Sequence, residues 1–150
     1  MTPDIPSIQR ACTRLISQYA YLNDERRFDE LSLLFTDDAV LYRPSAPEQA
    51  IRGRAAILQA FEKRPANALT FHVCSDVLID VEDETRAVGR SRILLLSAIR
   101  PGDGQLAAVE SKMPVPGVFD DVFRLTTQGW QFAERRGAFW IPALDVTAPR

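Results

Sequence analysis

His72, in the segment TFHVCSD (residues 70–76), is the only histidine in this chain of 150 residues. An imidazole titrates near neutral pH, and it acts well as a general base when a carboxylate holds its ring N–H, fixes the tautomer and stabilises the imidazolium. Six carboxylates are candidates for that partner: Asp24, Asp37, Asp38, Asp76, Asp120 and Asp121. Spacing along the chain does not choose among them. The competing interpretation is a strand histidine that is exposed or hydrogen-bonded and has no catalytic role.

Alternation along the segment around His72 predicts which side chains share a face. The odd positions of residues 69–81 form a nearly continuous apolar face: Leu69, Phe71, Val73, Val77, Ile79 and Val81. His72 falls on the opposite face with Thr70, Cys74 and Asp76. We expect this mixed face to line a pocket or to meet solvent.

Helical periodicity dominates the first part of the chain. Apolar residues recur every three or four positions over residues 8–22, which predicts an amphipathic helix. A second helical pattern covers residues 28–35, and a third covers residues 54–64, between a glycine and a proline. Asp24 is expected near the bend between the first two helices.

The chain after residue 68 is rich in β-branched and aromatic residues, which are typical of strands. Long antiparallel strands, separated by EDE, PGDG and TQG turns, are predicted over residues 69–82, 85–100, 117–127 and 129–141. Helices followed by strands indicate one α+β domain over residues 1–150, with three N-terminal helices packed on a curved antiparallel sheet.

Two stretches between these elements are less regular. AVLYRPS (residues 39–45) predicts a short strand that ends at Pro44, after a turn that contains Asp37 and Asp38. Pro114 and Pro116 place residues 105–116 in a loop or at a sheet edge.

Composition excludes several classes of partner and cofactor. The net charge of −2 with 25% charged residues gives no electrostatic case for nucleic acid, and arginine pairs such as Arg135–Arg136 are interpreted as solvated faces. No glycine-rich loop is present, so we expect no cofactor, and one histidine with scattered acids predicts no metal site. Cys12 and Cys74 lack C-x-x-C spacing and predict free thiols. With no signal peptide and no membrane-spanning stretch, we expect a cytoplasmic protein.

Four motifs in order resemble the SnoaL-like branch of the nuclear transport factor 2-like superfamily over residues 8–141: YAYLNDERRFDELSLLFTDDAVLY, IRGRAAILQAF, FHVCSDVLIDVEDETRAVGRS and GVFDDVFRLTTQGWQFAERR. Within that branch the chain is most similar to scytalone dehydratase and hexachlorocyclohexane dehydrochlorinase. The resemblance implies a cone-shaped half barrel. It also implies a cofactor-independent lyase (a dehydratase) or isomerase that acts on a small hydrophobic hydroxylated or carbonyl compound in a closed pocket.

The resemblance implies a catalytic site of Asp24, His72 and Tyr42. Asp24 stands where these lyases place the aspartate of an Asp-His dyad, and His72 stands where they place the histidine. Tyr42, in VLYRP, matches a tyrosine that helps to hold a water on the substrate carbonyl.

Four further positions are predicted to contact substrate, and at each the chain departs from the family pattern. Asn23 replaces a second tyrosine, and Ser91 is the nearest counterpart of a second histidine. Asp120 and Arg124 are the nearest polar residues to those of a later strand.

The same resemblance leaves a second class of function open, because the fold also occurs in noncatalytic proteins. These are small-molecule binding proteins and partner subunits such as the β subunit of ring-hydroxylating dioxygenases. In either class the expected partners are a small hydrophobic ligand and further copies of the chain, as a homodimer or homotrimer joined through the convex face of the sheet.

Overall fold

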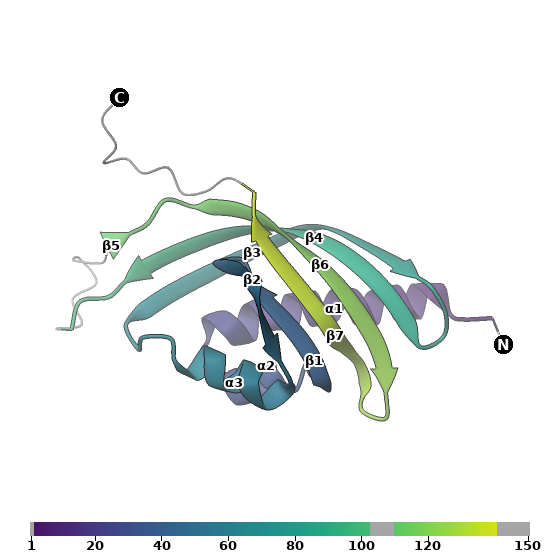
Figure 1. The fold of residues 1–150 in the computed structure, drawn as a ribbon. Helices are drawn as coiled ribbons and strands as arrows, with labels where there is room; N and C mark the ends of the chain where they lie inside the picture. Colours follow the sequence, from purple (N-terminus) through teal and green to yellow (C-terminus); the bar gives the residue numbers. More distant parts are fainter. Residues whose placement is uncertain (1, 103–109, 141–150) are drawn as a thin grey trace.

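Helix α1 (Ile5–Asp24) is the longest helix and lies against the sheet. The computed structural model describes residues 2–102 and 110–140, with the three helices on one side of a strongly curved sheet (Figure 1). Asp4 caps α1 by accepting a hydrogen bond from the backbone N–H of Ser7 at 3.3 Å. The buried stripe of α1 follows the predicted three-and-four spacing and consists of Ile8, Cys12, Leu15, Ile16, Tyr19, Ala20 and Asn23.

The second helix is shorter than predicted. Helix α2 (Phe28–Ser32) ends three residues early, and Phe35 opens strand β1 (Phe35–Arg43). Phe35 is fully buried and its ring centroid lies 5.3 Å from that of Phe132, so core packing draws the chain into the sheet. Asp37 and Asp38, predicted in a turn, therefore lie within β1.

Strand β2 (Ala46–Arg52) was not predicted, because most of its side chains are exposed and show no apolar alternation. It forms a hairpin with β1. Helix α3 (Arg54–Glu62) follows it, as predicted, after Gly53 (φ 88°) and before Pro65.

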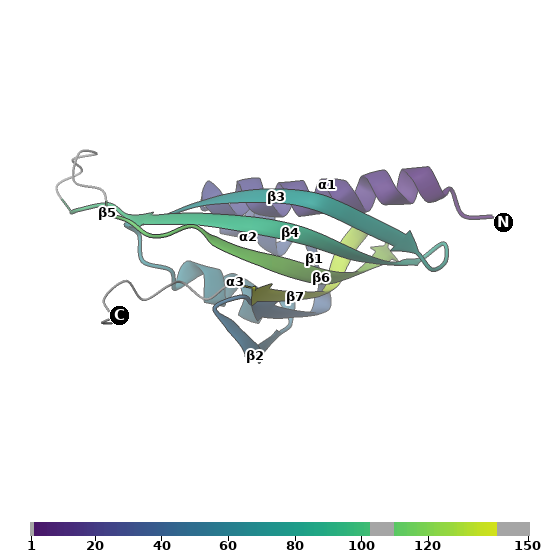
Figure 2. The same cartoon turned by 90° about the horizontal axis from the view of Figure 1, so that it is seen from above.

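The remaining strands are β3 (Ala68–Val81), β4 (Arg86–Ile99), β5 (Glu110–Ser111), β6 (Val115–Thr126) and β7 (Gly129–Phe139). The sheet order is β2-β1-β7-β6-β4-β3, with β5 paired to β4. The α+β fold and the four long antiparallel strands are confirmed, although β1 and β7 run parallel. The sheet is curved and unclosed, and α1 lies alongside its edge strand β3 (Figure 2).

Two of the predicted boundaries in the strand region differ from the structure or lie outside its described part. The loop or sheet edge predicted over residues 105–116 extends too far, because β6 begins at Val115 and Pro116 pairs with Leu94 inside the ladder of β6 and β4. Residues 103–109, and the last residue of the strand predicted over 129–141, lie outside the described part of the chain.

A bulge in β3 reorients the strand that carries His72. At Asp76 (φ 50°) the register with β4 shifts, and an extra residue reverses the in-out alternation beyond it. Before the bulge the even-numbered residues, including His72, face inward and Phe71 is 63% exposed; after it the odd-numbered Ile79 is buried. The predicted continuous apolar face over residues 69–81 is therefore wrong, and Asp76 does not share the face of His72.

Candidate active site

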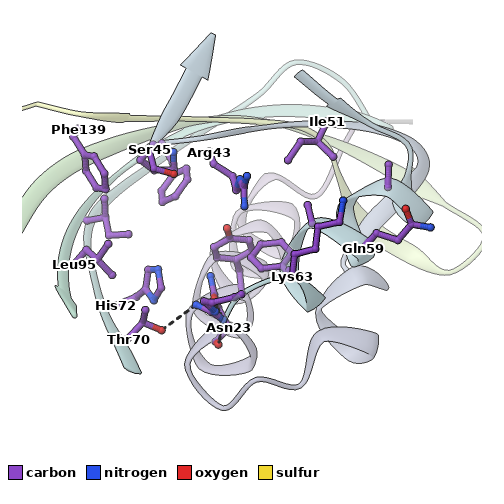
Figure 3. A pocket seen from close by; sticks show the side chains of 18 of the residues that line it. Asn23, Arg43, Ser45, Ile51, Gln59, Lys63, Thr70, His72, Leu95 and Phe139 are labelled. Atoms are coloured by element: carbon purple, nitrogen blue, oxygen red, sulfur yellow. Dashed lines mark hydrogen bonds between the residues drawn. The ribbon is translucent and has the colours of Figure 1, made fainter. Parts of the chain in front are cut away.

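A cavity of about 780 Å³ lies between the concave face of the sheet and helices α1 and α3 (Figure 3). Much of its wall is apolar and comes from β2, α3, β4, β6 and β7. These apolar residues include Ile51, Ala56, Phe61, Ile93, Leu95, Phe119 and Phe139. The cavity is large enough for a small organic molecule.

His72 and Asp24 form a hydrogen-bonded pair at the edge of this cavity. Nδ1 of His72 lies 2.5 Å from Oδ1 of Asp24, and the two side chains are 9% and 18% exposed. The backbone N–H of His72 donates to Oδ2 of Asp24 at 2.8 Å, and the hydroxyl of Thr70 donates to Oδ1 at 2.9 Å. With Nδ1 held by the carboxylate, the neutral tautomer presents Nε2 as an acceptor, and His72 lines the cavity.

The turn after α1 holds Asp24 at this place. Arg26 adopts a left-handed conformation (φ 60°), and its guanidinium donates to the backbone carbonyls of Arg64 at 3.0 Å and Pro65 at 3.1 Å. These bonds join the end of α1 to the segment that enters β3. The position of Asp24 relative to His72 is therefore held both by their own hydrogen bonds and by the bonds of Arg26.

Asn23, which the sequence suggests as a substrate-contact position, is part of the cavity wall. It is 3% exposed, and its side-chain and backbone oxygens accept from Nη2 of Arg64 at 2.8 and 2.9 Å. Nη1 of Arg64 also donates to the Thr70 hydroxyl at 3.3 Å. A continuous chain of hydrogen bonds thus runs from Asn23 through Arg64 and Thr70 to Asp24.

Tyr19 is a cavity residue that the sequence analysis missed. It is 3% exposed, and its ring centroid lies 6.5 Å from that of His72 at an interplanar angle of 82°. Burial raises the pKa of Tyr19, against an opposing effect of the nearby Arg135 charge, so the hydroxyl stays protonated and can donate. No hydrogen bond joins it to another described residue. The available signal was its place one helical turn before Asn23 on the same face of α1.

A buried ion pair lies behind Tyr19. Arg135 is fully buried, with its guanidinium carbon 4.2 Å from the Tyr19 centroid and 3.9 Å from the Phe119 centroid. Its Nε lies 3.5 Å from Oδ1 of Asp121, and burial raises the pKa of Asp121 to about 7 despite that positive charge. The prediction of a solvated arginine pair therefore holds for Arg136, whose side chain is 51% exposed, and is wrong for Arg135.

Tyr42 does not reach the cavity. Its neighbours in β1, Leu41 and Arg43, point inward to the core and the cavity, so strand alternation turns Tyr42 to the other face of the sheet. There the guanidinium carbon of Arg136 lies 4.0 Å from its ring centroid. The prediction of Tyr42 as a site residue is thus corrected by the direction of its side chain.

Asp120 and Arg124 also point away from the cavity. Asp120 pairs at 2.8 Å with Arg90 in an exposed ion pair, while its neighbour Asp121 takes the inward position. Arg124 pairs with Asp38 in a separate depression near the β6–β7 turn. Neither prediction of substrate contact holds, because both residues occupy outward positions of β6.

Ser91 is fully buried but does not line the cavity formed by the described residues. Its Oγ has no hydrogen-bond partner within residues 2–102 and 110–140. It faces the core from β4, so the predicted substrate contact is not made.

The described residues contain no group of three or more His, Cys, Asp or Glu side chains that could hold a metal ion. Within the same ranges, no helix is long and apolar enough to cross a membrane.

Solved structures from bacteria share this fold at low sequence identity. A provisionally assigned scytalone dehydratase from Novosphingobium aromaticivorans is 24% identical, with 88% of this chain and 83% of that chain covered and a TM-score of 0.73. A provisionally assigned dehydratase of the nuclear transport factor 2-like family from Streptomyces avermitilis is 17% identical, with coverage of 88% and 96% and a TM-score of 0.76.

A third structure, a nuclear transport factor 2-like protein with a cystatin-like fold from Novosphingobium aromaticivorans, is 21% identical. The alignment covers 96% of this chain and 86% of that chain, with a TM-score of 0.72. These likenesses establish the fold alone. A search of curated proteins gives no match.

Family membership rests on a direct match of the sequence. The SnoaL-like domain family matches residues 7–136, which span all three helices, both residues of the Asp24–His72 pair and most of the sheet. The chain therefore belongs to the SnoaL-like domain family.

Proposed function

We propose that this protein is a cofactor-independent lyase, a dehydratase, or an isomerase, in which His72 is the catalytic base. The observation that carries the proposal is the 2.5 Å contact between His72 Nδ1 and Asp24 Oδ1 beside a cavity that His72 lines. A carboxylate at this position fixes the tautomer and stabilises the imidazolium that forms when Nε2 accepts a proton.

In the proposed reaction, Nε2 of His72 removes a proton from a carbon next to a carbonyl group. The electron pair of the C–H bond forms a carbon–carbon double bond, and the carbonyl oxygen takes up the negative charge of the enolate. In a dehydration the enolate reforms the carbonyl and its electron pair makes a double bond between the α and β carbons, while the bond from the β carbon to its hydroxyl breaks and the imidazolium returns the proton to that oxygen, which leaves as water. In an isomerisation the same proton returns to a different carbon.

Tyr19 is proposed to bind the carbonyl oxygen, in place of Tyr42, which the resemblance assigned to holding a water on that carbonyl. Tyr19 lines the cavity, its ring lies edge-on to that of His72, and its raised pKa keeps the hydroxyl protonated. A donor in a partly desolvated site stabilises a developing enolate more than water does. Asn23 and Thr70 also line the cavity. Thr70 donates a hydrogen bond to Asp24, and Asn23 is connected to Thr70 through Arg64.

The test is a screen of hydroxylated aromatic and alicyclic ketones, which follows loss of water and exchange of the α-proton with deuterated solvent. His72→Ala should lower turnover by about 10²- to 10⁴-fold, the usual contribution of a positioned base. Asp24→Asn should also lower it, because the amide cannot stabilise the imidazolium. Asp76→Asn, an exposed change on the same strand, is the matched control. Turnover that is unchanged in both site variants would remove the proposed base.

A noncatalytic binding protein is the second candidate. Two observations favour it. The chain lacks the second histidine that the resemblance to scytalone dehydratase implies, and its cavity is large enough for a small ligand. Saturable binding of a screened ketone, without loss of water or α-proton exchange, would support this function over the first.

A cytoplasmic location is also proposed. Cys12 and Cys74 are both free thiols, and burial raises the pKa of Cys12 to about 12, which keeps it protonated and unreactive. Free buried thiols are usual in reducing compartments. Fractionation of the native host would test the location.

A further inference from the structure

The cavity is lined by cations although the chain as a whole carries a net charge of −2. Four basic side chains belong to its wall: Arg43, Arg52, Lys63 and Arg64. No Asp or Glu of the described residues belongs to that wall. Asp24 instead lines a separate groove between α1 and β3, on the other side of His72. A concave surface with one sign of charge concentrates ligands of the opposite sign.

The cations are separated from the Asp24–His72 pair across the cavity. In Figure 3, His72 and Thr70 project from one side, and Gln59 and Lys63 lie on the opposite side. Arg43 enters from the sheet and points into the space between them. A ligand that fills the cavity can therefore meet the base at one end and a cation at the other.

Arg43 and Arg64 differ in the hydrogen bonds that their guanidinium groups make with described residues. Arg64 donates to Asn23 and Thr70, so its charge supports the hydrogen-bond chain behind His72. Arg43 is half-buried, makes no ion pair within residues 2–102 and 110–140, and has a buried Nε without a hydrogen-bond partner there. A partly buried cation without a counter-ion is unfavourable, and an anionic ligand in the cavity would supply the missing partner to this guanidinium.

We infer that the substrate is a carboxylic acid whose carboxylate binds Arg43, while its hydroxylated or keto-bearing ring lies toward His72. The guanidinium fork matches a carboxylate with two parallel hydrogen bonds, which sets the orientation of the ligand as well as its affinity. Arg52 and Lys63 lie more exposed at the cavity rim and attract the anion. This inference rests on the proposed function only for the role of His72; the anion site itself does not depend on turnover.

The test compares a probe acid with its neutral amide, 6-hydroxy-2-naphthoate with 6-hydroxy-2-naphthamide, by fluorescence titration of the full chain. The acid should bind about tenfold more tightly or better, the effect of one charge-assisted hydrogen-bonded pair. Arg43→Met should remove this preference, and Arg43→Lys should keep part of it because the charge remains. Arg92→Met, which changes an exposed arginine on the outer face of β4, is the matched control and should keep the full preference.

Three outcomes of this titration would overturn the inference: equal binding of the acid and the amide, no binding of either at millimolar concentration, or a preference for the acid that Arg43→Met retains. Thermal unfolding of each variant verifies that it is folded. His72→Ala separates this inference from the proposed function, because it should abolish α-proton exchange while leaving the preference for the acid intact. Exchange without an acid preference would leave His72 as the base and remove Arg43 as the anion site.

Discussion

Asp24 and His72 are 48 residues apart in the chain and are joined by two hydrogen bonds, one to the imidazole ring and one to the backbone. The backbone bond is possible because β3 is an edge strand, whose outward N–H groups have no neighbouring strand. The last residue of α1 satisfies one of them with the same carboxylate that holds the ring. The sheet edge and the candidate catalytic pair are therefore stabilised by one side chain.

The tautomer of His72 can be measured directly, because the protein has one histidine. Protein labelled with ¹⁵N-histidine should show a proton on Nδ1 and none on Nε2 in the neutral form, because Asp24 holds Nδ1–H. Asp24→Asn should shift this tautomer balance, and Asp76→Asn should not. A proton mainly on Nε2 in the unmodified protein would contradict the proposed base.

Matched substitutions can show which of two tyrosines, Tyr19 or Tyr42, donates a hydrogen bond to the substrate carbonyl oxygen. Tyr19→Phe should lower kcat by about 10²-fold on any substrate found in the screen, as for loss of one donor to an enolate oxygen. Tyr42→Phe should leave kcat unchanged, because Tyr42 packs on Arg136 at the opposite face of the sheet. Equal losses in both variants would argue against the assignment of Tyr19.

Stability should depend on pH through the buried pair of Asp121 and Arg135. Burial raises the pKa of Asp121 from 3.8 to about 7, so between these values the native state keeps a proton that the unfolded state has lost. The free energy of unfolding should therefore fall as pH rises from about 4 to about 7, by at most roughly 1.4 kcal/mol per pH unit from this group. Exposed carboxyls with lowered pKa, such as Asp4 and Asp83, have the opposite effect, but only below their ordinary pKa of 3.8.

The matched variant for this pH effect replaces both partners, Asp121→Leu with Arg135→Met. Removing only Asp121 would leave the buried guanidinium of Arg135 without its polar neighbour, and that loss of stability would obscure the pH effect. Urea unfolding at a series of pH values should show the slope between pH about 4 and about 7 in the native protein and its loss in the double variant. A slope that is the same in both proteins would exclude Asp121 as its source.

Gly137 allows β7 to pack closely against the turn between β1 and β2. A Cβ at this position would lie 2.4 and 2.5 Å from the ring carbons of Pro44 and 2.7 Å from Phe119. Gly137→Ala should therefore destabilise the protein by about 1–3 kcal/mol in urea unfolding, as overpacking does. Gly102→Ala, whose Cβ would meet no atom of the described residues within 4 Å, should change stability by less than about 0.5 kcal/mol.

The outer face of β3 and β4 should mediate self-association. Phe71 pairs with Leu96 and Val73 with Leu94 across the two strands, and the exposed fractions of these side chains range from 39% to 63%. Adjacent exposed apolar pairs of this kind mark interfaces. We expect a homodimer or homotrimer in analytical ultracentrifugation, shifted to monomer by Phe71→Glu but not by Leu125→Glu on β6. A native protein that is monomeric throughout would contradict this prediction.

The sequence predicted the main elements of the fold because their signals are local. The apolar period of α1 and the composition of the four long strands report burial of each segment on its own. The end of α2 and the whole of β2 could not be predicted in this way. Phe35 leaves the helix for long-range packing on Phe132, and β2 is held mainly by backbone pairing with β1.

For the candidate site, the sequence by itself determined that His72 is the only imidazole, and family resemblance chose Asp24 from six carboxylates. The tertiary structure alone decided the direction of the side chains. The bulge at Asp76 turns His72 inward, and strand alternation sends Tyr42 outward. Helix packing brings Tyr19 to the cavity instead. These outcomes depend on register and on contacts between distant segments, and a shift of one residue in register reverses which side chains face the cavity.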